Sequence, residues 1–567
     1  MLTLGLLNFR DAGAALVRDG RIVAAAEEER FVRIKHVTAL PLKAVRSCLE
    51  QAGATLADVE TVAVPWKYWQ VGRRARLAVG AMLRSPTLFR VKSRRSAERL
   101  TQEWMEQIRL APLLRETFGP CPARVQFLDH HLCHAASAFF LSPFERAAVL
   151  IADGASESHT AMLALGEGTR LTPLARIPLP HSLGQFYAAM TAFLGFRPDQ
   201  DEYIVMGLAA YGKPIYADTI RRHILSPTAD GMFRLDTRVL DFHLARVGIF
   251  VPALTNLLGP NRQTDEPLTE RHQDIAASAQ LVLEEILLGL ARCLKRLTGE
   301  SRLCLAGGVA FNCVANARIQ REAGFQEVYV QPAAGDAGAA LGAALWAEVR
   351  RRGVRPEPMP HVYWGPQYAD RQISEALDST GLKGESVDEP ALCERVAQDL
   401  SEGKLVFWFQ GRMEWGPRAL GNRSLLADPR RANVRDLIND KVKLREPFRP
   451  FAPAVLEERA SDYFDLPGPS PYMLFTYPVR PSARETIPAV VHVDGTARVQ
   501  TVDRTSNPRF RRLLETFGRL TGVPVLLNTS FNVNEPIVCT PREAVHCFLR
   551  TQVDRLVIGN VLVKREA

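Results

Sequence analysis

The chain contains the same strand–turn–strand unit twice, and this repeat restricts the folds open to its N-terminal part. The first copy has three short apolar strands within residues 2–26, and the second has three that begin at residue 148. In each copy an aspartate, Asp11 or Asp153, follows the first strand. Short apolar strands bounded by Asp-Gly or Glu-Gly turns are typical of β-meanders. The repeat therefore predicts two α/β lobes built on one plan.

A duplication of this kind is typical of the two-lobed fold of actin and the sugar kinases, in which the first turn of each copy faces a phosphate. Two later segments fit the same use. Gly307-Gly308 follows an apolar strand, and Gly335-Asp336-Ala337-Gly338 leads into a helix. Such turns present backbone N–H groups to phosphate. The proline-rich residues 353–360 place a domain boundary near 350–365, with a second α/β unit after it.

A pair of histidines in the N-terminal part has the spacing of metal ligands. His130 and His134 are four residues apart, so on a helix both imidazoles project from one face. Two histidines with carboxylates and open positions suit iron(II), manganese or zinc, and the pattern favours iron. Asp153 and Asp336 lie in phosphate-type turns and would complete the set. The alternative is that the histidines form hydrogen bonds within the structure.

Five basic side chains of the C-terminal part lie among glycines and prolines. They are Arg418, Arg423, Lys443, Arg445 and Arg449. Arginine binds phosphate oxygens in a bidentate manner. A solvated basic face would contain helix-forming residues instead, so the pattern favours a phosphate or nucleotide site.

A second basic run, Arg73–Arg99, has apolar residues interleaved. We interpret it as the solvated face of a helical insert, with contact to an anionic acceptor or to nucleic acid as the alternative.

The composition excludes several classes of protein. The 567 residues carry 71 Lys+Arg against 62 Asp+Glu, a net charge of +9 that is weak evidence for nucleic-acid binding. Nine scattered cysteines without a CxxC pair indicate free thiols in a reducing compartment. The sequence contains no apolar run of about 18 residues, the length that a membrane span needs. We expect a cytoplasmic protein with no membrane partner.

A series of longer motifs runs in order along nearly the whole chain. The N-terminal part contains EEERFVRIKH at 27–36, HHLCHAASAFFLSPF at 130–144, VMGLAAYGKP at 205–214, LCLAGGVAFNCVANARI at 303–319 and QPAAGDAGAALGAAL at 331–345. The C-terminal part contains GRMEWGPRALGNRSLLADP at 411–429, VKLREPFRPFAPAVL at 442–456, VHVDGTARVQTV at 491–502 and LLNTSFNVNEPIVCTP at 526–541. With these motifs the chain resembles the O-carbamoyltransferase family of nodulation protein U and the antibiotic carbamoyltransferases, such as the tobramycin and cephamycin enzymes.

The resemblance implies an α/β protein of two domains. Residues 1–355 would form a duplicated actin-like (TsaD-like) carbamoyl-transfer domain, and residues 365–567 a YrdC-like domain that makes carbamoyl-adenylate from carbamoyl phosphate and ATP. The carbamoyl group then passes to a hydroxyl of a small secondary-metabolite or sugar acceptor. The implied partners are ATP with magnesium, carbamoyl phosphate and the acceptor, and a homodimer is compatible with the family.

Site residues follow from the resemblance position by position. The metal, iron(II) or another divalent ion, would be held by His130, His134, Asp153 and Asp336. The nucleotide would lie against Gly307, Gly308, Gly335 and Gly338, with Asn312 close by. Carbamoyl phosphate and the ATP phosphates would be bound by Lys443 and Arg449, both with catalytic roles, and by Arg418, Arg423 and Arg445. Arg498, Asn528 and Ser530 would orient the same ligands.

One departure from the family pattern concerns the transfer step. The family usually has His-Asp-Ala-Ser after the first strand, where this chain has Arg10-Asp11-Ala12-Gly13. That histidine is the natural general base, and arginine cannot replace it because it does not lose its proton in proteins. Asp11 is then the nearest candidate for the catalytic base. The alternatives are an amine acceptor, a tRNA threonylcarbamoyl-type transferase, or a nucleotide-binding partner without transfer activity.

Overall fold

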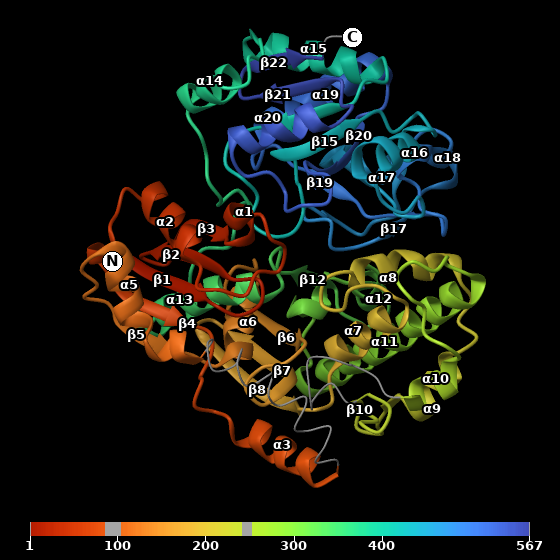
Figure 1. The fold of residues 1–567 in the computed structure, drawn as a ribbon. Helices are drawn as coiled ribbons and strands as arrows, with labels where there is room; N and C mark the ends of the chain where they lie inside the picture. Colours follow the sequence, from red (N-terminus) through yellow and green to blue (C-terminus); the bar gives the residue numbers. More distant parts are fainter. Residues whose placement is uncertain (1, 85–103, 241–251, 566–567) are drawn as a thin grey trace. The chain divides into compact units, whose positions relative to one another are not determined.

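The computed structural model describes residues 2–84, 104–240 and 252–565 (Figure 1). The chain forms two compact units. Unit 1 contains Met1–Glu28 and His36–Met359, and unit 2 contains Glu29–Lys35 and Pro360–Ala567. The change from unit 1 to unit 2 lies between Met359 and Pro360, within the proline-rich segment.

Unit 1 contains two five-stranded sheets with the same strand order. The first has the order β3-β2-β1-β4-β5 and the second β8-β7-β6-β11-β12. In the first sheet β2 is antiparallel to β1 and β3, and β4 and β5 run parallel to β1. In the second sheet β7 is antiparallel to β6 and β8, and β11 and β12 run parallel to β6. The duplicated unit expected from the sequence is therefore present, and it extends from three strands to five. The strands are β1 (Leu2–Leu7), β2 (Gly13–Arg18), β3 (Arg21–Glu27), β4 (Val59–Val64), β5 (Arg124–Phe127), β6 (Arg146–Ala152), β7 (His159–Glu167), β8 (Arg170–Pro178), β11 (Arg302–Ala306) and β12 (Glu327–Val330).

The two copies are joined by a pair of equivalent helices, α6 (His130–Phe139) and α13 (Asp336–Arg352), which follow β5 and β12. These helices pack against each other, and each also packs on the sheet of the other copy: α6 contacts β6 and β11, and α13 contacts β1, β2 and β4. Small residues make the close approach possible. A Cβ atom at Gly342 of α13 would lie 1.8 Å from the carbonyl oxygen of Cys133 on α6, and one at Gly5 of β1 would lie 1.9 Å from that of Ala340.

The remaining elements of unit 1 are helices and a hairpin outside these two sheets. They are α2 (Leu42–Gln51), α3 (Gly72–Arg84), α5 (Leu110–Phe118), α7 (Leu183–Phe193), α8 (Glu202–Leu208), α9 (Ala217–His223), α10 (Pro252–Leu258), α11 (Glu270–Thr298), α12 (Cys313–Glu322), and the hairpin of β9 (Leu225–Pro227) and β10 (Phe233–Leu235). Within the described ranges, the chain contains no helix long and apolar enough to cross a membrane.

Unit 2 is built on one mixed sheet of eight strands in the order β13-β22-β21-β14-β15-β20-β16-β19. Trp408 of β14 packs with Phe510 and Phe517 of α19 in its core. The sheet strands are β13 (Glu385–Ser386), β14 (Val406–Phe409), β15 (Arg423–Ala427), β16 (Ala452–Leu456), β19 (Gln500–Val502), β20 (Val525–Ser530), β21 (Arg555–Ile558) and β22 (Val561–Lys564). The other elements are α14 (Asp370–Asp378), α15 (Glu389–Ser401), α16 (Val434–Ile438), α17 (Ala460–Tyr463), α18 (Pro481–Arg484), α19 (Pro508–Thr521), α20 (Pro541–Arg550), β17 (Tyr477–Pro478) and β18 (Thr496–Ala497).

A short N-terminal segment, Glu29–Lys35, belongs to unit 2 although its flanking residues belong to unit 1. It contains α1 (Glu29–Val32). Arg30 donates a hydrogen bond to the carbonyl oxygen of Gly416 at 3.0 Å, and Arg33 donates to that of Ile537 at 2.8 Å. Part of the sequence motif EEERFVRIKH is therefore packed within unit 2, which its composition did not predict.

The packing of α6 on α13 makes a clear prediction for stability. Gly342→Ala inserts a methyl group at the helix contact, and overpacking of this kind costs about 1–3 kcal/mol of the free energy of unfolding. Gly289→Ala on α11 is the matched control, because the nearest atom to its Cβ position is 3.8 Å away. That change should stabilise the chain by roughly 0.5–1 kcal/mol. Urea unfolding followed by circular dichroism measures both, and equal effects of the two substitutions would contradict the close contact.

Candidate active site

The four predicted metal ligands come together in unit 1. His130 and His134 lie on the first turns of α6, Asp153 follows β6, and Asp336 is the first residue of α13. His130 Nε2 lies 3.2 Å from His134 Nε2, 3.3 Å from Asp153 Oδ2 and 3.4 Å from Asp336 Oδ1. One donor atom from each of the four side chains lies within 4.8 Å of the others. Two imidazole nitrogens and two carboxylate oxygens form a donor set that suits iron(II), manganese or zinc.

Surrounding groups hold these side chains in position. The carbonyl oxygen of Pro65 lies 3.0 Å from His130 Nδ1, so this nitrogen carries the proton and Nε2 is left to bind a metal. The backbone N–H of Gly308 donates to Asp153 Oδ1 at 3.2 Å. Partners of this kind orient metal ligands and set their tautomers. The sequence analysis named the four candidate ligands but gave no indication of Pro65.

The electrostatics of this cluster favour a cation. Burial opposes a charge on His130, but hydrogen bonds to Asp153 and Asp336 outweigh it and raise the pKa of His130 well above its usual value. Burial alone would raise the pKa of Asp153, yet the hydrogen bond from His130 and the charge of His134 hold it well below the usual range. Two ionised carboxylates thus face the imidazoles in a buried site. A divalent cation would take the place of the shared proton.

The predicted glycine turns have structural roles of their own. Gly307 has a φ of 92°, and a Cβ atom there would lie 2.2 Å from the carbonyl oxygen of Ala152. Asn312 caps α12, where its Oδ1 accepts from the N–H of Ala315 at 3.0 Å, and its Nδ2 donates to Gln280 at 2.9 Å. The side chain of Asn312 is therefore engaged within the protein. Contact of these residues with a nucleotide stays a prediction.

Asp11 lies in the turn after β1, four residues beyond the strand, whereas Asp153 directly follows β6, and Asp11 does not join the metal cluster. Its Oδ1 lies 2.6 Å from Nδ1 of His36. Its Oδ2 lies 3.8 Å from the Cβ position built on Gly335, the residue before Asp336. Arg10, at the position where the resemblance predicts a histidine, forms an ion pair with Asp199 at 2.7 Å. The sequence analysis did not identify His36.

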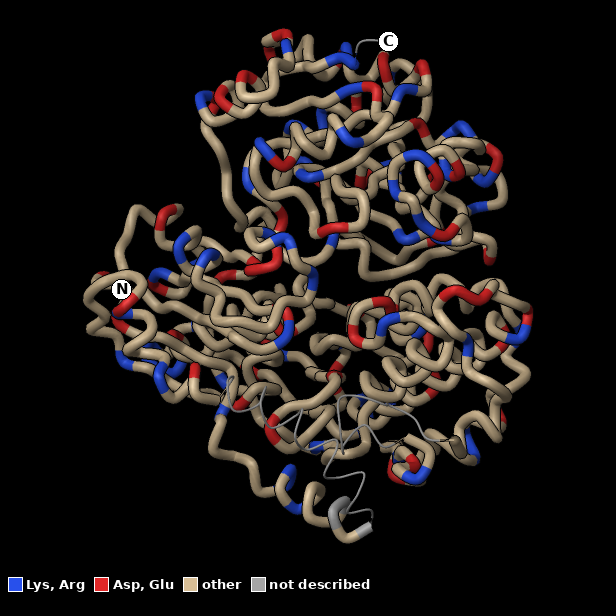
Figure 2. Tube along the Cα trace, in the orientation of Figure 1, with Lys and Arg blue, Asp and Glu red and all other residues tan. Residues whose placement is uncertain are grey.

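In the described part of the basic run, Arg76 is exposed, as expected for a solvated face, while Arg73 and Arg74 also bind backbone oxygens. Arg73 Nε donates to the carbonyl oxygen of Leu179 at 2.6 Å, and Arg74 Nη2 donates to that of Ser156 at 2.6 Å. These two arginines therefore anchor α3 to neighbouring loops. Basic and acidic residues are interspersed along the described chain of both units (Figure 2). The cations at 90–99 lie outside the described residues.

In unit 2, Lys443 and Ser530 lie together, as the phosphate-site prediction requires. Lys443 ends a π-helical turn at Asn439–Lys443, a feature frequent at functional sites. Its buried Nζ lies 2.5 Å from the carbonyl oxygen of Ser530 and 2.7 Å from Asn532 Oδ1. Burial, with the charges of Arg445 and Arg449, lowers the pKa of Lys443 well below its usual value. The charges of Arg445 and Arg449 therefore lie close enough to Lys443 to disfavour its protonated form.

The other predicted cations of unit 2 differ in their surroundings. Arg445 Nε donates to Asn439 Oδ1 at 2.8 Å, and Arg449 lies 3.4 Å from Glu446. Arg418 and Arg498 are half-buried. Asn528 is buried and its amide donates to Gln500 Oε1 at 2.8 Å.

Arg423 is fully buried. Its guanidinium donates to the carbonyl oxygens of Gln410 and Asn422, at 2.5 and 3.0 Å, and lies 3.7 Å from the centre of the Phe409 ring. Arg423 therefore holds the 410–422 loop, and its surroundings do not favour the predicted contact with phosphate. Buried Glu414, which the sequence analysis missed, has the same role: its Oε1 accepts from the N–H groups of Leu420 and Asn422 at 2.8 and 2.7 Å.

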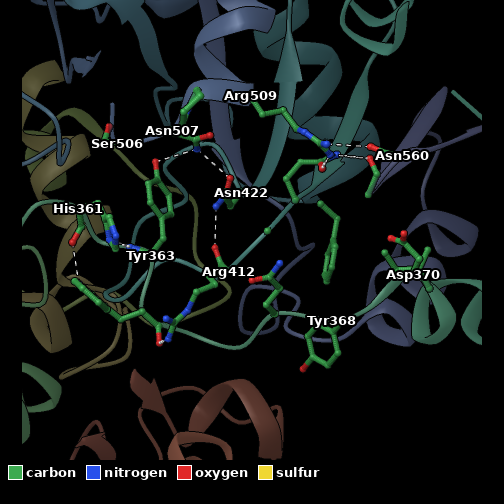
Figure 3. Close-up of a pocket in the computed structure, with 18 residues that line it drawn as sticks. His361, Tyr363, Tyr368, Asp370, Arg412, Asn422, Ser506, Asn507, Arg509 and Asn560 are labelled. Carbon is green, nitrogen blue, oxygen red and sulfur yellow. Dashed lines mark hydrogen bonds between the residues drawn. The ribbon is translucent and has the colours of Figure 1, made fainter. Parts of the chain in front are cut away.

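A separate pocket of about 460 Å³ lies in unit 2 (Figure 3). Its aromatic walls include Trp364 and Tyr368. Asn507, at the start of α19, donates to Asn422 Oδ1 at 2.9 Å and to the Tyr363 hydroxyl at 3.0 Å, so these polar side chains are already paired. None of the predicted phosphate-binding residues is among the described residues that line this pocket. The GRMEWGPRALGNRSLLADP motif contributes Gly411, Arg412 and Asn422 to its lining.

With the two sites described, the family can be assigned. Residues 3–345 match the carbamoyltransferase N-terminus family and residues 397–565 match the carbamoyltransferase C-terminus family. Nodulation protein NolNO of Sinorhizobium fredii is 41% identical over 565 residues, which cover 98% of this chain and 79% of the relative. Nodulation protein U of the same species is 30% identical over 555 residues, covering 94% of each. The chain belongs to the carbamoyltransferase family.

Solved structures show only distant likeness. HypF in its phosphate- and nucleotide-bound form has a TM-score of 0.32 at 14% identity, covering 62% of this chain and 56% of that one. Component A of the Acidaminococcus fermentans (R)-2-hydroxyglutaryl-CoA dehydratase has a TM-score of 0.32 at 16% identity, covering 62% and 98%. These scores carry no argument about function.

His492, in the loop that carries Arg498, should make the stability of the protein depend on pH. Burial lowers the pKa of His492 to about 4, whereas the unfolded chain has about 6.5. Above about pH 6.5 the His492 imidazole is neutral in both the folded and the unfolded chain. As the pH falls towards 4, the imidazole of the unfolded chain takes up a proton first, so the free energy of unfolding decreases. His492→Gln should remove about 1–2 kcal/mol of the loss between pH 7 and pH 5. Urea unfolding at both pH values measures the free energy of unfolding, with His546→Gln at an exposed position as control. An equal loss of stability from pH 7 to pH 5 in the wild type and in His492→Gln would contradict the low pKa of His492.

Proposed function

We propose that the protein is an ATP-dependent carbamoyltransferase that works in two steps. Unit 2, which we propose to be YrdC-like, converts carbamoyl phosphate and ATP into carbamoyl-adenylate, with release of phosphate and pyrophosphate. Unit 1 transfers the carbamoyl group to a hydroxyl of a small secondary-metabolite or sugar acceptor and releases AMP. The observation that carries the proposal is the convergence of His130, His134, Asp153 and Asp336 in a chain of this family.

The cations of unit 2 support the first step. Arg445 and Arg449 are close enough to Lys443 to lower its pKa, so several positive groups gather in one region. Such a cluster attracts phosphate oxygens and compensates the charge that develops when phosphoryl groups move. Lys443 itself is held by backbone oxygens of Ser530 and Asn532, which fixes its position. We infer that Arg418, Arg445, Arg449 and Arg498 contact the ligands directly.

The donor set of unit 1 supports the second step. A bound divalent ion, which we propose to be iron(II), would supply positive charge to the adenylate phosphate as AMP departs. His130 and His134, oriented by α6, together with Asp153 and Asp336 would hold it. ATP would carry magnesium into unit 2.

A second candidate is transfer to an amine. An amine is already nucleophilic, and Arg10 cannot act as the base that a hydroxyl acceptor needs. A tRNA acceptor has less support, because Arg73 and Arg74 are engaged with backbone oxygens. A nucleotide-binding partner without transfer activity is less favoured because all four metal-ligand positions are present.

The first step can be tested without knowledge of the acceptor. Pyrophosphate release from ATP and magnesium should require carbamoyl phosphate. Arg449→Gln should lower the rate at least about tenfold, because a hydrogen bond to a charged phosphate contributes about 1.5–3 kcal/mol. Arg371→Gln, with a side chain 85% exposed on α14, is the matched control. Release that ignores carbamoyl phosphate, or an equal effect of both substitutions, would reject the proposed step.

The metal can be tested separately. His134→Ala removes one of four donors and should leave the purified protein with less than about one tenth of the wild-type metal, in line with the 10- to 100-fold effect of even indirect ligand partners. Elemental analysis measures the content, with His223→Gln on α9 as control. The same variant should lose AMP release but keep pyrophosphate release, since only unit 1 is altered. Unchanged metal content would contradict the assignment.

A further inference from the structure

We propose that His36 is the general base of the carbamoyl-transfer step and that Asp11 is the positioning residue that orients it. The inference rests on the proposed function and names a group for the proton transfer that Arg10 cannot perform. It concerns residues that the sequence motifs did not assign to this role.

The first support is the contact itself. His36 Nδ1 and Asp11 Oδ1 are 2.6 Å apart, and both side chains are 30% exposed, so the pair is reachable from solvent. A carboxylate that accepts the Nδ1 proton of an imidazole fixes the tautomer with its lone pair on Nε2 and stabilises the imidazolium that forms. Asp11 is therefore better placed as the orienting group than as the base.

The second support is position in the duplicated fold. Asp153, after β6, faces the start of α6 through His130 at 3.3 Å. Asp11, after β1, lies in the equivalent turn of the other copy, and its Oδ2 is 3.8 Å from the Cβ position built on Gly335 at the start of α13. Asp336, a proposed metal ligand, is the next residue. The His36–Asp11 pair thus lies beside the place where the adenylate would be held.

The third support is backbone conformation. Seven described non-glycine residues have positive φ, and three of them belong to this cluster: Asp11 (52°), His36 (52°) and Asp199 (68°). Such conformations are sparsely populated and gather at functional sites, where the surrounding structure maintains them. Asp199 is the partner of Arg10. The arginine therefore ties two loops together at the point where a base is otherwise expected.

The carbamoyl-transfer step forms one bond and breaks one. The acceptor oxygen forms a bond to the carbamoyl carbon, and the bond from that carbon to the adenylate oxygen breaks. The hydroxyl proton passes to Nε2 of His36, and the electron pair of the broken bond leaves with AMP. The imidazolium then returns its proton to solvent. No oxidant or further reactant is needed.

The test uses the full chain with carbamoyl phosphate, ATP, magnesium and iron(II), and two probe nucleophiles. Water stands for a hydroxyl acceptor and needs a base, whereas hydroxylamine is an uncharged amine near neutral pH and does not. The variant is His36→Asn, because asparagine tolerates positive φ and its amide can still donate to Asp11. His223→Asn is the control. Pyrophosphate release reports the unit 2 step in every reaction, and the hydroxylamine rate of Asp336→Asn is subtracted as reaction of released adenylate.

We expect His36→Asn to keep pyrophosphate release, to lower AMP release with water about 100- to 10,000-fold, and to keep AMP release with hydroxylamine within about threefold. Equal loss with both nucleophiles, or no loss with water, would overturn the role of His36. Wild-type protein that releases no pyrophosphate would overturn the proposed function instead, which the first readout distinguishes. If His36→Asn fails to fold, His36→Gly replaces it, and added imidazole must then restore the reaction with water.

Discussion

The contact between α6 and α13 is the interaction on which unit 1 depends. Each helix packs on the sheet of the other copy, so the two halves of the duplication share one core. The contact brings the first turns of both helices together, and these turns carry His130, His134 and Asp336. It needs small residues, because a single methyl group at Gly342 would collide with the backbone of Cys133. The alanine- and glycine-rich sequence of α13 is thus a requirement of the site as well as of the fold.

The sequence predicted the duplicated strands and the histidine pair because both depend on local signals. That the histidines and the two aspartates bind a metal stays a prediction. Alternation of strands and turns reveals the repeat, and a spacing of four residues places two histidines on one helix face. The His36–Asp11 pair was missed for the opposite reason. The two residues are 25 positions apart, with β2, β3 and α1 between them, and both have positive φ, so their contact leaves no pattern in the sequence.

Burial is the second property that the sequence could not supply. Arg423 and Arg449 have similar neighbours in the chain, with glycine or proline nearby, and both were assigned to phosphate. The structure separates them: Arg423 is fully buried against Phe409 and donates to backbone oxygens. A buried guanidinium must satisfy its donors within the protein, so it shapes the loop that other groups use. Glu414 acts in the same way through three backbone N–H groups.

The duplication also explains how one turn can acquire two functions. Asp153 and Asp11 both lie in the turn after the first strand of their copy, and each turn brings an aspartate near the start of a helix. The difference lies in what each aspartate meets. Asp153 faces two imidazoles and becomes a metal-ligand candidate, whereas Asp11 faces Gly335 and a histidine from the segment between β3 and β4. A carboxylate surrounded by metal ligands favours a cation, and one paired with a single imidazole favours proton transfer. Divergence of the partners, with the aspartates retained, would account for the proposed metal site and the proposed proton transfer in one unit.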